Sequence, residues 1–246
     1  MTTRFIADLH LEEERPDITE AFLGFLPTYA HGIDALYILG DFFEAWIGDD
    51  ERTPLQETVA EALQAVTATG TRLYLMHGNR DFLIGHDFCE RVGAELLADP
   101  TVISLYGEPT LLMHGDSLCT ADEEYQTFRA NMRDPKWQQA FLQRSLAERQ
   151  TVARQMREIS QAKNQGKEQT IMDVTPEEVV QEMERHGVQR LIHGHTHRPA
   201  VHELNAGGQP ASRYVTGDWH EKAWYIEARE GADPELLSVP FNSLTG

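Results

Sequence analysis

The sequence has only two cysteines, Cys89 and Cys119, among its 246 residues, and it has no long run of apolar residues. Two cysteines are too few for a disulfide framework and are typical of a protein kept in a reducing compartment. A membrane-spanning helix needs roughly 18 to 20 consecutive apolar residues, and no segment approaches that length. The first residues enter a predicted strand and do not resemble a signal peptide. We therefore expect a cytoplasmic protein.

Positive charge is also scarce, because 21 Lys and Arg face 40 Asp and Glu, which gives a formal net charge of −19. Such an acidic balance argues against broad binding of nucleic acid. Nothing in the sequence predicts an obligate protein partner. The charge is unevenly distributed, however, because residues 125–170 carry nine Lys and Arg against four Asp and Glu.

Short runs of β-branched and aliphatic residues, each ending in a polar turn, alternate with helix-like stretches. The predicted strands are residues 4–10, 35–41, 72–81, 110–116, 190–195 and 213–218. Helices with a proline near the first turn are expected at residues 16–30, 54–69 and 175–187. Thr175 is the expected cap of the last of these helices. This alternation predicts an α/β fold with a largely parallel sheet, in which ligands bind at the carboxyl ends of the strands.

Residues 122–170 break this alternation, because they read as helix throughout apart from an early interruption at Pro135. Apolar residues recur there with helical spacing at Val152, Met156 and Ile159. We therefore expect a helical insert at residues 122–170 within a core made of residues 1–121 and 171–246. Its basic charge leaves two interpretations open, a solvated helical hairpin or a lid that recognises an anionic substrate.

Carboxylates, imidazoles and one amide recur at the polar ends of the predicted strands. The motifs are Asp8-Leu9-His10, Gly40-Asp41, Gly78-Asn79-Arg80-Asp81, His114-Gly115-Asp116 and Gly194-His195-Thr196-His197. If the backbone stays extended, residues two apart point the same way, so that Asp8 and His10, like His195 and His197, face one bound object. Each motif alone is weak evidence, but five in succession predict a site for a divalent transition metal. Seven ligands exceed the need of one ion and favour two ions that share a carboxylate.

The order D-x-H, GD, GN-x-D, HGD and GHTH resembles the signature of the calcineurin-like metallophosphoesterase superfamily over most of the chain. The resemblance implies an αββα sandwich with a helical insert, or lid, between the fourth and fifth metal-binding motifs. It also implies two Mn²⁺ ions per chain, although other divalent transition metals are possible. The implied metal ligands are Asp8, His10, Asp41, Asn79, His114, His195 and His197, with Asp41 bridging the two ions.

The segments FIADLHL, LGDFFEAWIGDD, HGNRDFLIG, HGDSLCTAD and GHTHRP resemble, more closely, the UDP-2,3-diacylglucosamine diphosphatase family of lipid A biosynthesis. The resemblance implies hydrolysis of the pyrophosphate of UDP-2,3-diacylglucosamine by water attack at the α-phosphorus. The products would be UMP and 2,3-diacylglucosamine 1-phosphate. Because this substrate is a lipid, the protein is expected to bind peripherally to the cytoplasmic face of the inner membrane.

Substrate contacts are also implied by the resemblance. They fall on Asn79, Arg80, Asp122, Ser160, Asn164, Lys167 and His195. The aromatic and aliphatic residues of the insert offer a pocket for the acyl chains, although such a stripe is also typical of plain core. The candidate pocket residues are Phe128, Trp137, Phe141 and Ile171.

Arg80 departs from the wider superfamily, much of which carries histidine after the Asn of the GN motif as a candidate general acid. Arginine does not give up its proton at accessible pH, so it can act only by stabilising charge. A phosphate monoester leaves readily as an anion, because its second pKa is about 6. Arg80 is therefore predicted to be catalytic and favours cleavage of a P–O–P bond over an alkyl phosphodiester.

Other side chains near the motifs are expected to support the site. Asp81 and Asp116 are predicted to orient turns or ligands, and His77 and His193 to lie in the core or behind the ligands. Two other functions remain as alternatives. One is a phosphodiesterase for soluble or cyclic nucleotides, and the other is an inactive binding scaffold with the same fold. The seven intact ligand positions argue against the scaffold.

Overall fold

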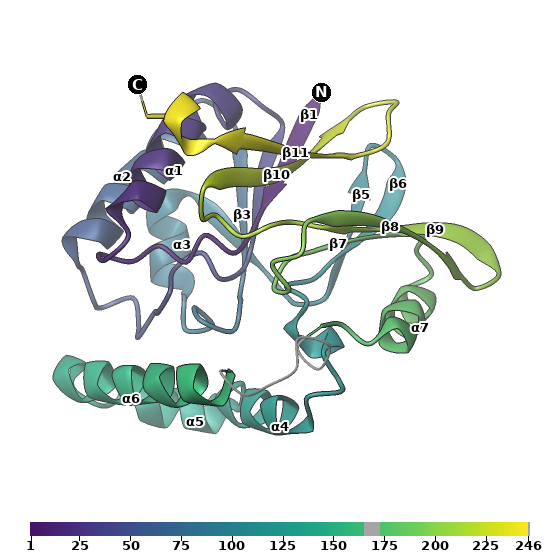
Figure 1. Ribbon diagram of the computed structural model, residues 1–246. Coiled ribbons are helices and arrows are strands. Elements are labelled where there is room, and N and C mark those ends of the chain that lie inside the picture. The colour runs from purple at the N-terminus through teal and green to yellow at the C-terminus, as the bar shows by residue number, and fades with distance from the viewer. Residues whose placement is uncertain (165–172, 246) are drawn as a thin grey trace.

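The computed structural model describes the backbone of residues 1–164 and 173–245 and the side chains of these residues except 160–164. Within these residues, two β-sheets pack against each other (Figure 1). The first has the strand order β11-β10-β1-β2-β3-β4 and the second the order β5-β6-β7-β9-β8. The pairings are parallel from β1 to β4 and across β6, β7 and β9, and antiparallel elsewhere.

The first sheet consists of β1 (Thr2–Ile6), β2 (Ala35–Leu39), β3 (Arg72–Met76), β4 (Ala94–Leu97), β10 (Lys222–Arg229) and β11 (Glu235–Pro240). The second consists of β5 (Thr101–Leu105), β6 (Glu108–Leu112), β7 (Arg190–His193), β8 (Ala200–Ala206) and β9 (Gln209–Val215). The expectation of one largely parallel sheet is therefore wrong. Each sheet joins parallel strands to antiparallel ones, which form hairpins near the edges.

The continuous apolar sequence of β2 follows from burial on both faces of the sheet. Tyr37 and Leu39 point into the core between the sheets, where Ile192 of the second sheet also lies. Leu36 and Ile38 point to the other face and pack in the core below the helices. A parallel strand covered on both sides needs apolar residues at every position rather than an alternating pattern.

Helices cover the outer face of each sheet. On the first sheet lie α1 (Pro16–Tyr29), α2 (Pro54–Ala68) and α3 (His86–Val92), whose apolar side chains form one core with β2 and β3. On the second sheet, α7 (Pro176–His186) packs Val179 and Met183 against Leu111 and Leu191. This layering is the αββα sandwich that the resemblance implies, and that expectation is confirmed.

The N-termini of α2 and α7 differ in how they are capped. Thr53 caps α2 with a full capping box, because its side chain and that of Gln56 each accept from the other residue's backbone N–H. Thr175 precedes α7 as expected, but its side chain makes no capping hydrogen bond. Its hydroxyl instead accepts a hydrogen bond from Thr120 at 2.8 Å. The predicted side-chain cap of α7 is therefore wrong.

Three further helices lie together across one end of the two sheets (Figure 1): α4 (Glu123–Met132), α5 (Pro135–Leu142) and α6 (Leu146–Asn164). Arg149 fixes α6 to the core, because its buried guanidinium donates to the carbonyl of Ile47 at 2.6 Å and pairs with Asp50. Phe141 of α5 is buried in the same core as helices α1 to α3. In the described part of the chain, no helix is long and apolar enough to cross a membrane.

Both cysteines are buried thiols, and burial raises the pKa of Cys89 and of Cys119 to about 12. The thiolate is the reactive form, so raising the pKa above its usual value leaves almost none at pH 8. We expect both thiols to react with a thiol reagent at least about 100-fold more slowly in the folded protein than in urea. Stopped-flow absorbance measures both rates. A cysteine that reacts equally fast in both states would contradict its burial.

Candidate active site

The predicted motifs lie in loops directly after β1, β2, β3, β6 and β7, where the carboxyl ends of strands from both sheets meet. Five of the candidate ligands have a left-handed backbone, with φ between 48° and 68°: Asp8, His10, Asp41, His195 and His197. The extended alternation expected at D-x-H and H-x-H is therefore wrong. Turns, rather than strands, direct these side chains. Left-handed backbone costs residues with a Cβ roughly 1 to 2 kcal/mol each, and such strain clusters at functional sites.

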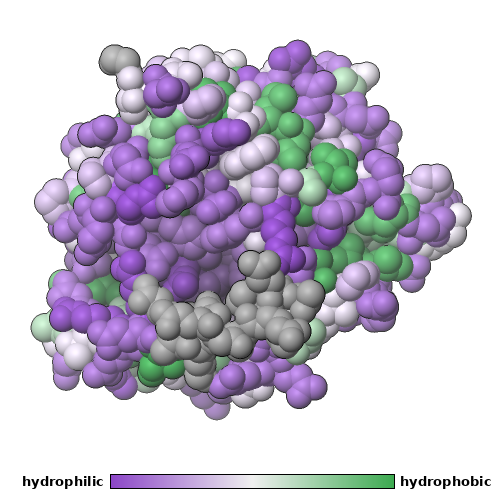
Figure 2. Space-filling view, viewed as in Figure 1, coloured by the Kyte–Doolittle hydropathy of each residue, from purple (hydrophilic) through white to green (hydrophobic). Residues whose placement is uncertain are grey.

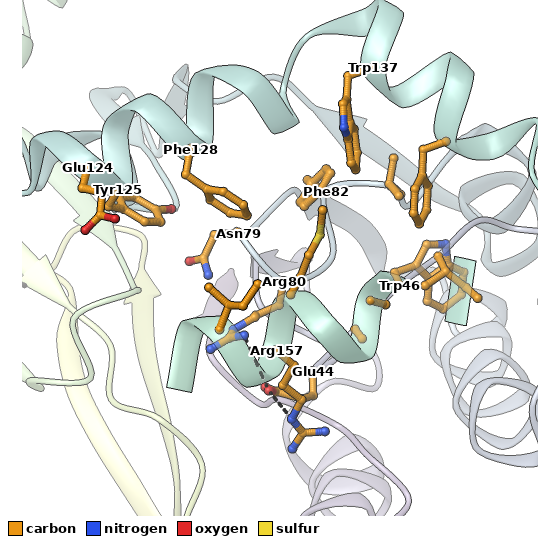
Figure 3. Close-up of a pocket in the computed structure, with 17 residues that line it drawn as sticks. Glu44, Trp46, Asn79, Arg80, Phe82, Glu124, Tyr125, Phe128, Trp137 and Arg157 are labelled. Atoms are coloured by element: carbon orange, nitrogen blue, oxygen red, sulfur yellow. Dashed lines mark ion pairs between the residues drawn. The ribbon is translucent and has the colours of Figure 1, made fainter. Parts of the chain in front are cut away.

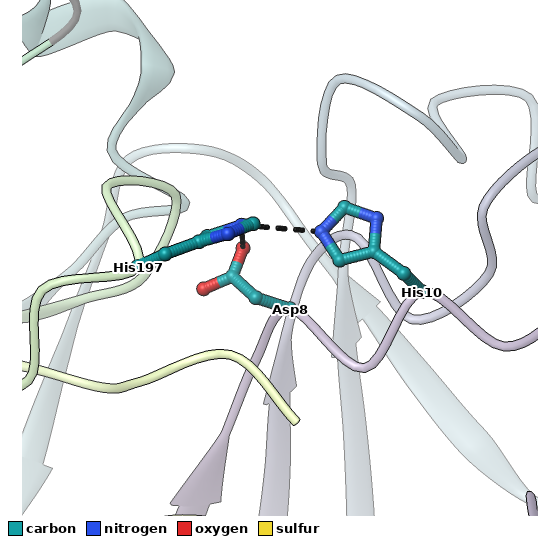
Figure 4. Close-up of side chains that lie close together, drawn as sticks. All are labelled: Asp8, His10 and His197. Carbon is teal, nitrogen blue, oxygen red and sulfur yellow. Dashed lines mark hydrogen bonds and ion pairs between the residues drawn. The ribbon is translucent and has the colours of Figure 1, made fainter. Parts of the chain in front are cut away.

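One cluster consists of Asp8, His10 and His197, whose candidate ligand atoms all lie within 4.8 Å of one another (Figure 4). The Nε2 atoms of His10 and His197 are 3.2 Å apart. Nε2 of His197 lies 3.7 Å from Oδ1 of Asp8. The other carboxylate oxygen of Asp8 accepts a hydrogen bond from the backbone N–H of His195 at 2.8 Å. Three side chains from the first and last motifs thus converge on one point.

The second cluster consists of Asp41, His114 and His195, with the same 4.8 Å limit. Nδ1 of His114 donates to the carbonyl of Leu39 at 2.9 Å, which leaves Nε2 facing the cluster. That Nε2 lies 3.1 Å from Oδ1 of Asn79 and 3.7 Å from Oδ1 of Asp41. The structure therefore brings Asn79 to this cluster as well.

Asp41 lies between the two clusters. Its Oδ1 faces His114, and its Oδ2 lies 3.7 Å from Nε2 of His10. The loops approach so closely that a Cβ on Gly78 would lie 2.1 Å from Oδ1 of Asp41. Only glycine fits at position 78 for this reason. All seven predicted ligands thus converge on one region, with Asp41 between the two clusters.

These residues fit a pair of divalent metal ions. Oδ1 of Asp8 is buried and has no hydrogen-bond partner in the part of the chain that the structure describes. Imidazole nitrogens of His10 and His197 face each other beside it. An unpaired buried carboxylate oxygen next to converging imidazoles is the environment that a cation satisfies. Carboxylate, imidazole and amide donors suit Mn, Fe, Co or Zn.

The electrostatics of the site favour positive charge. Burial alone would lower the pKa of His10 and His114, but the nearby carboxylates outweigh it and raise the pKa of each to about 9. Glu44 and Asp41 act on His10, and Asp41 and Asp116 act on His114. The same excess of negative charge would attract metal cations.

Asp81 supports the turns as predicted. It is fully buried and accepts hydrogen bonds from the backbone N–H groups of Gly78 at 2.8 Å and Phe42 at 2.7 Å. It therefore ties the loop after β2 to the loop after β3. His193 is also buried, and burial followed by Arg213 lowers the pKa of its side chain to about 3. His77 donates to the carbonyl of Ile84 at 2.6 Å, so both histidines serve the framework as expected.

A cavity of about 190 Å³ opens beside the clusters, between the loops of the core and helices α4 to α6 (Figure 3). Asn79 and Arg80 line it near the clusters. Its other walls are mostly apolar and include Phe82, Phe128, Trp137 and Phe141. On the face shown in Figure 2 hydrophilic side chains predominate.

The other predicted substrate contacts are distributed differently. Asp122 is buried and caps α4, because its side chain accepts from the N–H of Tyr125 at 3.0 Å. His195 stacks beside the ring of Tyr125, with 6.0 Å between ring centroids. The side chains of Ser160 and Asn164, and the whole of Lys167 and Ile171, lie outside the described residues.

Four residues of the site were missed by the sequence analysis. Glu44 is hydrogen-bonded to His10, and Arg157 of α6 reaches the same carboxylate. Tyr125 and Arg129 both bind Oδ2 of Asp116, each at 2.8 Å. The spacing of Tyr125 and Arg129, four residues apart on one helix face, is the only local signal that pointed to a shared partner.

The fold and the two clusters define a metal-dependent phosphoesterase architecture, and the comparisons agree. The chain belongs to the calcineurin-like phosphoesterase family, because the model of that family matches residues 1–199.

Within that family the chain is similar over nearly its whole length to proteins named UDP-2,3-diacylglucosamine hydrolase. The relative from Marinobacter nauticus is 68% identical, and the match covers 98% of each chain. A relative from Pseudomonas aeruginosa is 57% identical over 92% of this chain and 95% of the relative. One from Cellvibrio japonicus is 55% identical over 93% and 95% of the two chains.

The bond between Arg129 and Asp116 gives a test of how the insert is held. Asp116 is fully buried, and although burial opposes it, His114 and Arg129 keep its carboxyl pKa well below the usual value. Replacing Arg129 with Met leaves a buried charge with less compensation. We expect the free energy of unfolding to fall by about 2 kcal/mol. Urea denaturation followed by circular dichroism measures the change.

Arg154 is the matched control, because it is an exposed arginine on α6. Arg154→Met is expected to change the free energy of unfolding by less than about 0.5 kcal/mol. Equal stabilities of the two variants would show that the Arg129–Asp116 bond does not stabilise the protein.

Proposed function

We propose that the protein hydrolyses the pyrophosphate bond of UDP-2,3-diacylglucosamine and releases UMP and 2,3-diacylglucosamine 1-phosphate. The observation that carries the proposal is the apolar cavity that begins at Asn79 and Arg80, directly beside the two ligand clusters. Such a cavity suits a substrate with a phosphate group at one end and acyl chains at the other. The names of the relatives, at 55 to 68% identity, support the same substrate.

We propose Mn²⁺ as the metal. Asp8, His10 and His197 would hold one ion, and Asn79, His114 and His195 the other, with Asp41 shared between them. When bound, two such ions supply positive charge for the phosphoryl oxygens and make water a better nucleophile.

Arg80 provides the second source of positive charge. Its backbone N–H donates to Oδ1 of Asp41 at 2.8 Å, so its position is tied to the clusters. Its guanidinium is always protonated and can therefore stabilise charge on the departing phosphate without transferring a proton. A sugar 1-phosphate leaves as an anion of low basicity, which needs no general acid. Water attack at the α-phosphorus then places the new oxygen in UMP.

The proposed domain division assigns residues 1–121 and 171–246 to the core and residues 122–170 to a lid that recognises the substrate. Asp122, Ser160, Asn164 and Lys167 are the polar contacts proposed for this segment, together with Asn79, Arg80 and His195. The lipid substrate and the net positive charge of residues 125–170 support peripheral binding to the cytoplasmic face of the inner membrane.

Product analysis in ¹⁸O-water tests the reaction. The purified protein is given UDP-2,3-diacylglucosamine and, separately, bis-alkyl and cyclic phosphodiesters, with Mn²⁺ or with a chelator. We expect label in UMP, formed only with metal and far faster than products from the other substrates. Label in the sugar phosphate would instead place the attack at the β-phosphorus. Turnover of the diesters alone would favour the phosphodiesterase alternative, and no turnover of any substrate would favour the scaffold.

The acyl-chain assignment of the cavity is tested at Phe128. This side chain lines the cavity but is 44% exposed, so its removal should cost little stability. We expect Phe128→Ala to raise KM for the diacyl substrate about tenfold, because contact with an acyl chain is lost. Leu142→Ala is the control, because Leu142 is similarly exposed, at 41%, but does not line the cavity. An equal KM in both variants would remove Phe128 from the binding site.

A further inference from the structure

Glu44 contacts three groups that have separate places in the site, and Figure 3 shows two of them, Arg80 and Arg157. Its Oε2 atom accepts a hydrogen bond from Nδ1 of His10 at 2.8 Å. Its Oε1 atom lies 3.4 Å from Nε of Arg157 and 3.8 Å from Nη1 of Arg80. A carboxylate has about four lone-pair positions, so it can serve all three partners at once. Glu44 thereby joins a metal-ligand candidate, a phosphate-binding candidate and helix α6.

The bond from His10 determines which nitrogen faces the cluster. In the neutral imidazole, donation from Nδ1 to Glu44 leaves on Nε2 the lone pair that a metal ion requires. Nε2 is the atom that lies 3.2 Å from His197 and 3.7 Å from Asp41. A carboxylate on the far nitrogen fixes the orientation of the ring and makes the near nitrogen more basic. The side chain of Glu44 is only 13% exposed, so water competes weakly for this bond.

Arg157 connects this carboxylate to the helices that cover the site. It lies on α6 and also pairs with Glu12, in the loop after β1, at 2.6 Å. Glu12 and Glu44 thus bind the same guanidinium. Within the described residues, however, only Glu44 is also hydrogen-bonded to His10. Glu44 therefore contacts both α6, through Arg157, and the ring of His10.

We propose that Glu44 is a positioning residue that couples the docking of α6 to the orientation of His10. When α6 is docked, Arg157 holds the carboxylate against His10 and metal binding at the cluster of Asp8, His10 and His197 is strengthened. The inference rests on the metal site of the proposed function. The effect of Arg157 on metal binding that this coupling predicts is opposite in sign to the effect that charge alone predicts. Arg157 is a cation, so charge alone predicts that its removal strengthens the binding of another cation nearby.

The test measures Mn²⁺ binding to the metal-stripped protein by titration calorimetry, without substrate. Glu44→Gln keeps the shape and removes the charge. Glu44→Asp keeps the charge but withdraws the carboxylate by about 1.5 Å, the length of one C–C bond. We expect both variants to bind Mn²⁺ at least about tenfold more weakly at one of the two sites. Glu12→Gln is the matched control and is expected to stay within about twofold of the wild type.

Arg157→Gln supplies the second arm of the test. Coupling predicts Mn²⁺ binding that is about threefold weaker, whereas charge alone predicts tighter binding. Tighter binding by this variant, or wild-type affinity in Glu44→Asp, would overturn the inference but leave the metal site intact. A wild-type protein that binds no Mn²⁺ would instead overturn the proposed metal site, and the inference with it. Thermal melts of the metal-free variants show whether each one is folded.

Discussion

The burial of two carboxylates, Asp8 and Asp41, is the constraint on which the rest of the site depends. Their exposed fractions are 0% and 2%, and they lie where the two sheets meet. A buried carboxylate is stable only if positive charge or hydrogen-bond donors come to it. Four imidazoles from three different loops are brought to these two residues, and five of the candidate ligands have a left-handed backbone. Two sheets rather than one are required, because His114, His195 and His197 follow β6 and β7, whereas the aspartates and His10 follow β1 and β2. The sandwich architecture therefore compensates the buried carboxylates and, in doing so, brings together the side chains that would bind metal ions.

The same constraint changes how the basic charge of the insert is understood. From the sequence, this charge has two interpretations, solvated helices or recognition of an anionic substrate. The structure shows a third use, because three of the arginines bind acidic groups of the core. Arg129 binds Asp116, Arg149 binds Asp50, and Arg157 binds Glu12 and Glu44. Much of the positive charge thus attaches the helices to an acidic core.

The sequence was sufficient to predict which residues meet, but not how they are presented. The carboxyl ends of parallel strands meet at one edge of a sheet, so a polar residue just past a strand arrives there whether its backbone is extended or left-handed. The seven ligand candidates were therefore found although the alternation argument was wrong. Strand β11 was missed because it is a half-exposed edge strand with no clear alternation. The residues of the insert helices that contact Glu44 and Asp116 were missed for another reason. Such contacts join residues far apart in the chain, and pairing of this kind leaves no local pattern.

The order of chemical groups along the cavity limits which substrate can fill it. Asn79 and Arg80 line the cavity, and Asn79 contacts His114 of the second ligand cluster, so the bond that is cleaved is expected to lie near these residues. The apolar wall formed by Phe82, Phe128 and Trp137 then has to face a part of the substrate beyond that bond. A soluble nucleotide would place polar groups against this wall and leave them without hydrogen bonds, which is unfavourable. An acyl chain attached to the leaving group would instead cover the apolar wall, so that the wall and the chain are both removed from water. Under the proposed function, selectivity for a lipid substrate would follow from the position of the metal-ligand loops relative to α4 and α5.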